Sequence, residues 1–179
     1  MATTTFRPIG SGSTTQLGRF GDSSNYLCVD EVISDSDTTY VQLSGDAILF
    51  DLYTFDFSTI DTGDTINNIT VYNVARHNGG KIFPSNRRSI KENGVITHSS
   101  TSAMTSTYST YSTVWSTKPS NGTAWTKTDL SSLEIGGGFF TGGGGEGRLT
   151  QVYCIIDYTP ASVGSVVVKP IMMFLETDD

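Results

Sequence analysis

Short runs of apolar or alternating residues, separated by turn residues, recur along the chain from Asn25 onward. Within residues 69–76, apolar side chains alternate with Thr70, Tyr72 and Arg76, and a period of two is typical of a β-strand. Turn signals about every eight to twelve residues favour two packed antiparallel sheets over strands that alternate with helices. The pattern therefore predicts an all-β protein, an antiparallel β-sandwich of the jelly-roll kind. The runs expected to form strands are residues 26–29, 39–43, 47–55, 69–76 and 149–158.

Tight turns are predicted where Asn and Gly adjoin, because these residues accept a positive φ at little cost. Asn78-Gly79-Gly80 predicts a hairpin whose return strand is residues 81–83, and Asn93-Gly94 predicts a second hairpin. A last strand is expected over residues 163–175, where Pro170 indicates a sheet edge or a bulge because proline has no N–H to donate.

The first residues of the chain are polar and rich in Thr, Ser and Gly, with Pro8 as a breaker. Residues 1–24 are therefore expected to form an irregular N-terminal arm, and residues 25–179 a single sandwich domain. An arm of this composition is frayed unless something holds it, so we expect it to pack against a neighbouring copy or partner. Phe6 and Arg7 are its candidate interface residues.

Composition and charge narrow the classes of partner. The chain has 179 residues, 36% of them hydrophobic, with roughly a quarter Ser and Thr, which suits strands with a polar outer face. A net charge of −7 argues against nucleic acid, and Arg87, Arg88 and Lys91 are expected to be solvated strand-end charges.

No apolar run is long enough to cross a bilayer, and the N-terminal residues lack the apolar core of a signal peptide, so cytoplasmic synthesis is expected. Cys28 and Cys154 are expected to be buried free thiols.

The segment from Trp115 to Gly136 is the most distinctive part of the sequence. Thr126 followed by Asp129 predicts a capping box that begins a short helical turn near residues 127–133, with Leu130 and Leu133 facing the sheet and Gly136 ending the turn. Pro119 and Gly122 are expected to return Trp125 toward Trp115. Each buried indole N–H then needs a partner, for which loop carbonyls are expected. We interpret the tryptophans as supports of the fold, whereas in a lectin a Trp pair would stack on sugar rings.

This segment, together with Arg148, Gln151 and Tyr153 on a late strand, carries a resemblance to a known family. It resembles the small jelly-roll or concanavalin-like β-sandwich found in structural proteins of tailed phages and archaeal viruses. The resemblance covers about residues 110–158, and it implies a virion part without transferring any catalytic residue.

Three kinds of chemical site are weighed from the sequence. A glucanase-like sandwich needs two carboxylates that face each other, but Glu134, Glu146 and Asp157 show no paired spacing, so we expect no enzymatic activity. The acidic turns at residues 35–37 and 61–64 do not match a dedicated calcium loop, so no metal is expected, and no cofactor. His77 and His98 are expected to be exposed neighbours of turns.

Glycines at positions 136–138 and 142–145 bracket Phe139 and Phe140. No phosphate-binding motif follows them, so two interpretations stay open. The segment is either a mobile hairpin loop, or a tip whose two exposed aromatic rings insert into a neighbouring subunit or receptor.

These observations predict a virion structural protein, a capsid-associated, decoration or tail component that acts by assembly and binding. Its expected partners are copies of itself, as a trimer, and other virion proteins, with neither nucleic acid nor membrane. The alternative is a carbohydrate- or receptor-binding module of a tail fibre or adhesin, which would bind a glycan.

Overall fold

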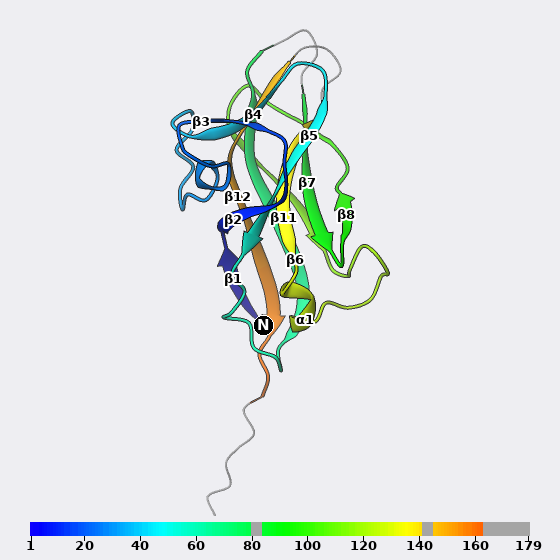
Figure 1. Cartoon of the computed structure of the whole chain (residues 1–179). Helices are drawn as coiled ribbons and strands as arrows, with labels where there is room; N and C mark the ends of the chain where they lie inside the picture. Colours follow the sequence, from blue (N-terminus) through cyan, green and yellow to red (C-terminus); the bar gives the residue numbers. More distant parts are fainter. Residues whose placement is uncertain (80–83, 141–144, 163–179) are drawn as a thin grey trace, which may run out of the picture.

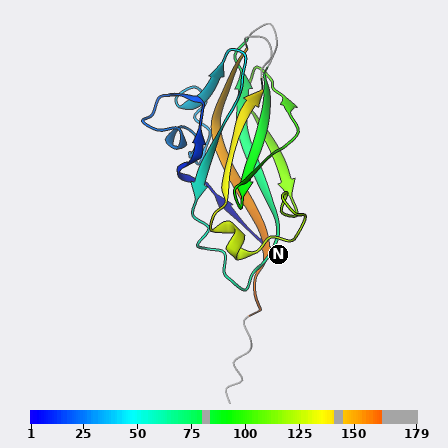
Figure 2. The ribbon, with the colours of Figure 1, turned by 45° about the vertical axis from the view of Figure 1, so that its right-hand side comes forward.

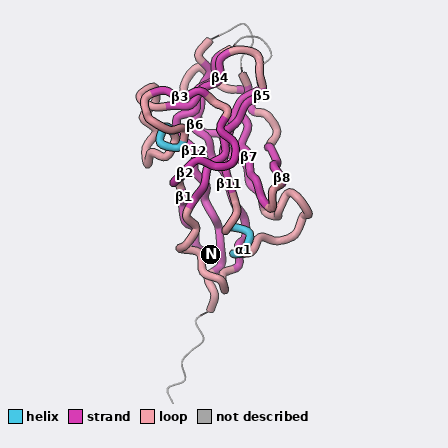
Figure 3. Tube along the Cα trace, viewed as in Figure 1, coloured by secondary structure: helices cyan, strands magenta, loops and turns pink. Residues whose placement is uncertain are grey.

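The computed structural model describes residues 1–79, 84–140 and 145–162, and its strands form two six-stranded antiparallel sheets packed face to face (Figures 1 and 2). This confirms the all-β sandwich. Two short helical segments interrupt the strands, η1 (Tyr26–Cys28) and α1 (Lys127–Leu130) (Figure 3). The strands are β1 (Ala2–Phe6), β2 (Pro8–Thr15), β3 (Gly18–Phe20), β4 (Tyr40–Ser44), β5 (Ile48–Phe55), β6 (Thr65–His77), β7 (Ser85–Glu92), β8 (Val95–His98), β9 (Ser102–Ala103), β10 (Ser109–Trp115), β11 (Glu134–Phe140) and β12 (Glu146–Thr159).

We call the two layers the first and second sheet. The first sheet has the order β10-β6-β12-β4-β3, and β1 also pairs with β12. The second sheet has the order β2-β5-β11-β7-β8, and β9 also pairs with β7. One side of β12 pairs with β6, while its other side pairs first with β4 and then, near its end, with β1. The long strand β12 thus organises the first sheet.

The core lies between the sheets, and β6 shows how the sequence places residues there. Ile69, Val71, Asn73 and Ala75 are fully buried, while the residues between them are less buried or face outward. The predicted alternation is confirmed on a strand longer than expected. Each buried aliphatic side chain of this kind stabilises the fold by about 1.5–3 kcal/mol.

The sheets approach each other closely at β11. The side-chain amide of Asn73, on β6, donates to the carbonyl oxygen of Arg87 at 2.9 Å, across the sandwich. A Cβ added to Gly137 would lie 2.1 Å from Nδ2 of Asn73, so a larger residue would fit there only if Asn73 moved. Residues 136–138 were predicted as the end of the helical turn and the start of a loop. They instead lie inside a central strand, because close packing overrides the low strand propensity of glycine.

The N-terminal residues do not form an irregular lead-in. Strand β1 pairs with β12 in the first sheet, β2 pairs with β5 in the second, and β3 returns to the first sheet beside β4. The chain therefore crosses between the sheets at Arg7, and both sheets contain residues from the expected arm. Low order was predicted because these residues are polar and have small side chains. The strands that pair with them lie far away in sequence, so the pairing could not be seen there.

Local turn chemistry was predicted with mixed success. Asn93 and Gly94 have φ of 48° and 79°, and Glu92 pairs with Val95, which confirms the hairpin between β7 and β8. The hairpin predicted at Asn78 falls partly on residues 80–83, which lie outside the described residues; the next described strand, β7, belongs to the second sheet, whereas β6 belongs to the first. The predicted strands 81–83 and 163–175 lie outside the described residues.

The expected strand at residues 26–29 is also corrected. Tyr26–Cys28 forms a turn of 3₁₀-helix, in which Val29 N–H donates to the carbonyl of Tyr26 at 3.2 Å. Cys28 and Val29 are fully buried. A short apolar run indicates burial, but its length does not distinguish a strand from a helical turn.

Candidate functional site

The two tryptophans support one end of the sandwich. Trp115 ends β10 and Trp125 precedes α1, and both are buried. The indole N–H of Trp125 donates to the carbonyl of Trp115 at 2.9 Å, which is the kind of partner expected from the sequence. Gly122 has a φ of 73°, and its N–H donates to Lys118 in the tight turn that contains Pro119. Their placement fits a supporting role rather than a sugar-stacking platform.

The capping box confirms how α1 begins. Asp129 Oδ2 accepts hydrogen bonds from the main-chain N–H and the hydroxyl of Thr126, at 2.8 and 2.6 Å. Burial alone would raise the pKa of Asp129, but the bonds from Thr126 and Lys118 hold it below its usual range. Leu130 and Leu133 are buried beneath the turn, as predicted. The capping box and the two buried leucines therefore hold the short α1 in place at this end of the molecule (Figure 1).

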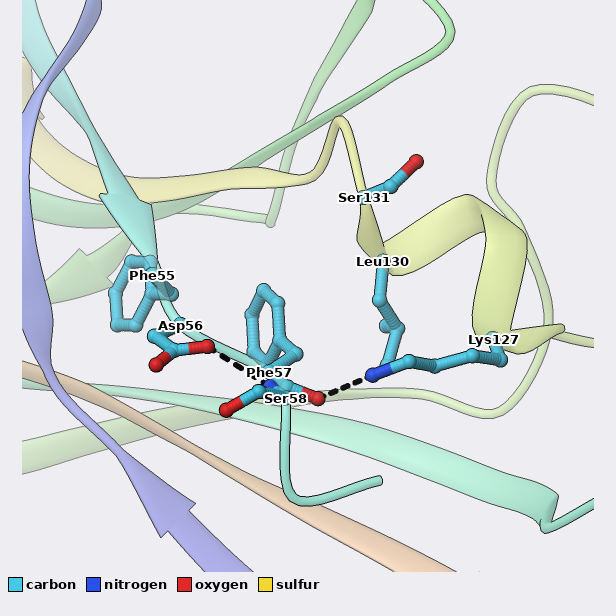
Figure 4. Close-up of a pocket in the computed structure, with 7 residues that line it drawn as sticks. All are labelled: Phe55, Asp56, Phe57, Ser58, Lys127, Leu130 and Ser131. Carbon is cyan, nitrogen blue, oxygen red and sulfur yellow. Dashed lines mark hydrogen bonds between the residues drawn. The ribbon is translucent and has the colours of Figure 1, made fainter. Parts of the chain in front are cut away.

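A first pocket opens between α1 and the segment after β5 (Figure 4). Its volume is about 260 Å³. The ammonium of Lys127 spans it and donates to the carbonyl of Phe57, while Asp56 accepts from Ser58 N–H at 2.9 Å. Its lining residues are Phe55, Asp56, Phe57, Ser58, Lys127, Leu130 and Ser131.

A second pocket adjoins the first and shares Phe55 and Ser131 with it. Its volume is about 310 Å³. The hairpin turn between β7 and β8 forms one side, and the residues that lead from α1 into β11 form another. Its lining residues are Thr54, Phe55, Lys91, Asn93, Gly94, Ser131, Ser132, Leu133 and Glu134.

Glu134 and Lys91 are the charged pair of the second pocket. Lys91 Nζ lies 2.8 Å from Glu134 Oε1, and Ser13 donates to Glu134 Oε2 from both its N–H and its hydroxyl at 2.7 Å. Burial would raise the pKa of Glu134, but Lys91 and Ser13 together lower it. Glu134 is therefore held ionised as an acceptor, and Lys91 as a donor, beside neutral hydroxyl and amide groups.

The predicted motif residues on β12 lie elsewhere, on the outer face of the first sheet. Arg148 binds Asp37 at 2.8 Å and stacks over Tyr40, and Gln151 donates to the carbonyl of Glu31 at 2.6 Å. Tyr153 stacks on Tyr72, with ring centroids 4.6 Å apart. The sequence pattern grouped these residues with the tryptophan segment, whereas the structure uses them to hold the loop of residues 31–39 and to stabilise cross-strand pairs.

The four candidate interface residues divide between core and surface. Phe6 is buried against Phe57, with ring centroids 4.9 Å apart, and Phe139 is fully buried against Gly147 of the opposite sheet. The prediction of two exposed rings was therefore wrong for Phe139, because a glycine on β12 makes room for its ring. Phe140 is 42% exposed, and Arg7 lies over Tyr153. An interface role for Arg7 and Phe140 stays a prediction.

Arg88 was missed by the sequence analysis. It was expected to be solvated, yet it is buried and donates to Thr113 on the opposite sheet and to Ser102, both at 3.0 Å. Burial lowers the pKa of this guanidinium. A charged residue on an apparently polar strand gives no sign that it points into the core.

The remaining candidate groups are placed as follows. Cys28 and Cys154 are buried free thiols, as predicted. His77 is buried rather than exposed, and His98 is partly buried beside Ser89. Within the described residues, no three His, Cys, Asp or Glu side chains are grouped to hold a metal ion. No helix there is long and apolar enough to span a membrane.

Comparison with known proteins gives a limited result. No family model matches the sequence, and neither does any curated protein. Among solved structures, one match is tailspike protein 4 of bacteriophage CBA120, described as its enzymatically active domain, with 15% identity and a TM-score of 0.41. The match covers 84% of this chain and 19% of the tailspike chain, so this chain spans about a fifth of that length.

This finding overturns the prediction that the chain is not an enzyme. That prediction relied on a resemblance to virion proteins that act by assembly, and here a bacteriophage tailspike domain is described as enzymatically active. At this identity and TM-score, however, the likeness transfers no activity, substrate or partner to this chain.

Proposed function

We propose that this chain is a saccharide-binding domain of a virion component, and that it holds its ligand in the first and second pockets. The observation that carries the proposal is the pair of adjoining pockets at the α1 end, which share Phe55 and Ser131. Their volumes of about 260 and 310 Å³ suit neighbouring residues of a saccharide rather than one large ligand.

The lining of the pockets matches the chemistry of a sugar. A sugar residue presents hydroxyl groups on its edges and C–H groups on its faces. Lys91 and the hydroxyl of Ser132 donate, Glu134 accepts, and the carbon-rich side chain of Phe55 lies between the two pockets. Lys91 and Glu134 are already held by bonds within the fold, so binding a ligand orders neither of them and loses little entropy there.

The virion setting is supported by the sequence resemblance of residues 110–158, a segment in which the capping box of α1 and the paired tryptophans lie close together. A tail component that binds a receptor glycan would account for both the virion setting and the two pockets. Assembly with copies of the chain and with other virion proteins remains part of it.

Glycan-array binding by the labelled chain tests this proposal, followed by calorimetry with the saccharides that bind. Ser132→Tyr fills the second pocket without removing a hydrogen bond given above, and it is expected to weaken binding at least about tenfold. Ser100→Tyr, at an exposed loop position away from the pockets, is the matched control and should bind normally.

Two outcomes would contradict the proposal: no saccharide binds, or Ser132→Tyr and Ser100→Tyr bind equally. The bound saccharides are also assayed for cleavage, by measuring new reducing ends. Binding of the chain to capsid or tail shells without any glycan binding would favour a purely structural role in the virion.

A further inference from the structure

Strand β10 has an open outer edge. All seven of its residues pair with β6 without a register shift, from Ser109 opposite Ala75 to Trp115 opposite Ile69. Within residues 1–79, 84–140 and 145–162, no strand pairs with β10 on its other side. An unpaired edge of this length presents a row of main-chain N–H and C=O groups that can accept another strand.

The features that normally protect a sheet edge are missing here. Residues 93–117 contain no Asp, Glu, Lys, Arg or Pro, and β10 has no bulge. Of the other edges, β2 contains Pro8 and two register shifts, and β3 is three residues long and contains Arg19. Strand β8 also has no charge, proline or bulge, but it is only four residues long. Edge strands that avoid association usually carry a charge, a proline or a bulge.

The edge is also held rigid from the inside. Thr113 accepts a hydrogen bond from buried Arg88 at 3.0 Å, and the hydroxyl of Tyr111 accepts one from Thr105 N–H at 3.1 Å. At the end of the strand, the carbonyl of Trp115 accepts from the indole of Trp125. The strand is therefore preformed, and pairing with it would cost little conformational entropy.

We propose that β10 of one copy pairs antiparallel with β10 of a second copy, so that the two first sheets join into one. The inference goes beyond the saccharide-binding proposal and does not depend on it. Each copy carries a net charge of −7, so copies repel overall, and β10 is the longer of the two edges without a charged residue, along which local repulsion is low.

The pairing has a defined symmetry. A strand paired antiparallel with its own copy lies on a twofold axis, which gives a dimer. A trimer would instead need a head-to-tail contact between two different surfaces. Thr110, Ser112 and Val114 point outward. With the axis at Ser112, this residue would face its counterpart and Thr110 would face Val114 of the second copy, and their β-branched or small side chains suit such pairs.

Sedimentation equilibrium of the full chain tests the proposal. We expect a concentration-dependent dimer. Ser112→Lys brings two ammonium groups together near the axis, and should weaken the dimer by about tenfold or more, with partial recovery in high salt. Ser44→Lys is the matched control, because Ser44 is exposed but lies on β4, which is paired on both sides.

Cross-linking provides a second readout that does not require a weakened dimer. Cysteine is placed singly at Thr110, Ser112 and Val114, and each variant is treated with a short bifunctional maleimide. The native thiols are buried and do not compete. We expect covalent dimers from these variants and none from Ser44→Cys.

A monomer at all concentrations, a trimer, or a dimer equally sensitive to Ser44→Lys and Ser112→Lys would overturn the proposal. Glycan binding of Ser112→Lys is measured in parallel and should match that of the unmodified chain. Failure of the saccharide proposal and failure of the edge proposal are thus seen separately.

Discussion

The side-chain amide of Asn73 donates to the main-chain carbonyl of Arg87 at 2.9 Å, a hydrogen bond that ties the two sheets together through the core. The same amide lies where a side chain on Gly137 would have to go. A polar residue and a glycine, both unusual inside strands, therefore depend on each other.

Asn73→Ala should lower the free energy of unfolding by about 1–3 kcal/mol, because it leaves the Arg87 carbonyl without its partner. Gly137→Ala should destabilise by a similar amount, because its Cβ would overlap Asn73. Since Asn73→Ala removes the overlapped atoms, the double variant should be less destabilised than the sum of the two. Urea denaturation measures the free energy of unfolding of all three variants. If the losses of the two single variants simply add in the double variant, Asn73 and a side chain at position 137 do not interfere with each other.

Trp125→Phe should lower the free energy of unfolding by about 1–3 kcal/mol. The ring remains apolar, but the carbonyl of Trp115 loses the indole N–H, and the smaller ring leaves space. Denaturation followed by the fluorescence of Trp115 provides the measurement. An unchanged midpoint would mean that the indole bond contributes nothing to the fold.

Thr126→Ala should destabilise by about 0.5–2 kcal/mol, because it removes the N-cap hydroxyl of α1. Thr128→Ala, two residues further on at an exposed helical position, is the control. It should be neutral or slightly stabilising, because alanine favours the helix. Equal losses in the two variants would indicate that the capping box is not what holds α1.

Acid should release the loop of residues 31–39 from the first sheet. Burial would raise the pKa of Asp37, but bonds from Arg148, Tyr108 and Arg76 lower it from 3.8 to about 2. A folded-state pKa below the unfolded one gives stability that is full above about pH 4 and is lost as the pH falls toward 2. Stability measured from pH 5 to pH 2 should fall more steeply for the unmodified chain than for Asp37→Asn.

Neither cysteine should react with a thiol reagent in the folded protein. Burial raises the pKa of both Cys28 and Cys154, and neither side chain is exposed. Two thiols per chain should titrate after denaturation. Fast labelling of one thiol under native conditions would show that its surroundings open locally.

Features that depend on neighbouring residues in the sequence could be predicted. The alternation in β6, the Asn93-Gly94 turn and the Thr126 capping box each act over a few residues, and the structure contains all three. The burial of Leu130 and Leu133 followed from their spacing in the same way.

Features that depend on distant partners could not be predicted. Gly136–138 looked like a loop, since the close approach of Asn73 is invisible in sequence, and Phe139 looked exposed, since Gly147 is remote from it. The pockets were missed for the same reason. They form where the end of β5 lies beside α1 and the β7–β8 turn, and no local sequence pattern predicts that these three segments are neighbours.

The crossing of the chain at Arg7, between β1 and β2, has a consequence for synthesis on the ribosome. The residues that pair with β1, from Cys154 to Tyr158, are translated after all the other described strands. Strand β1 therefore lacks this partner until β12 has emerged from the ribosome, and the first sheet cannot close before then. We expect the nascent chain to need protection of β1 during this interval.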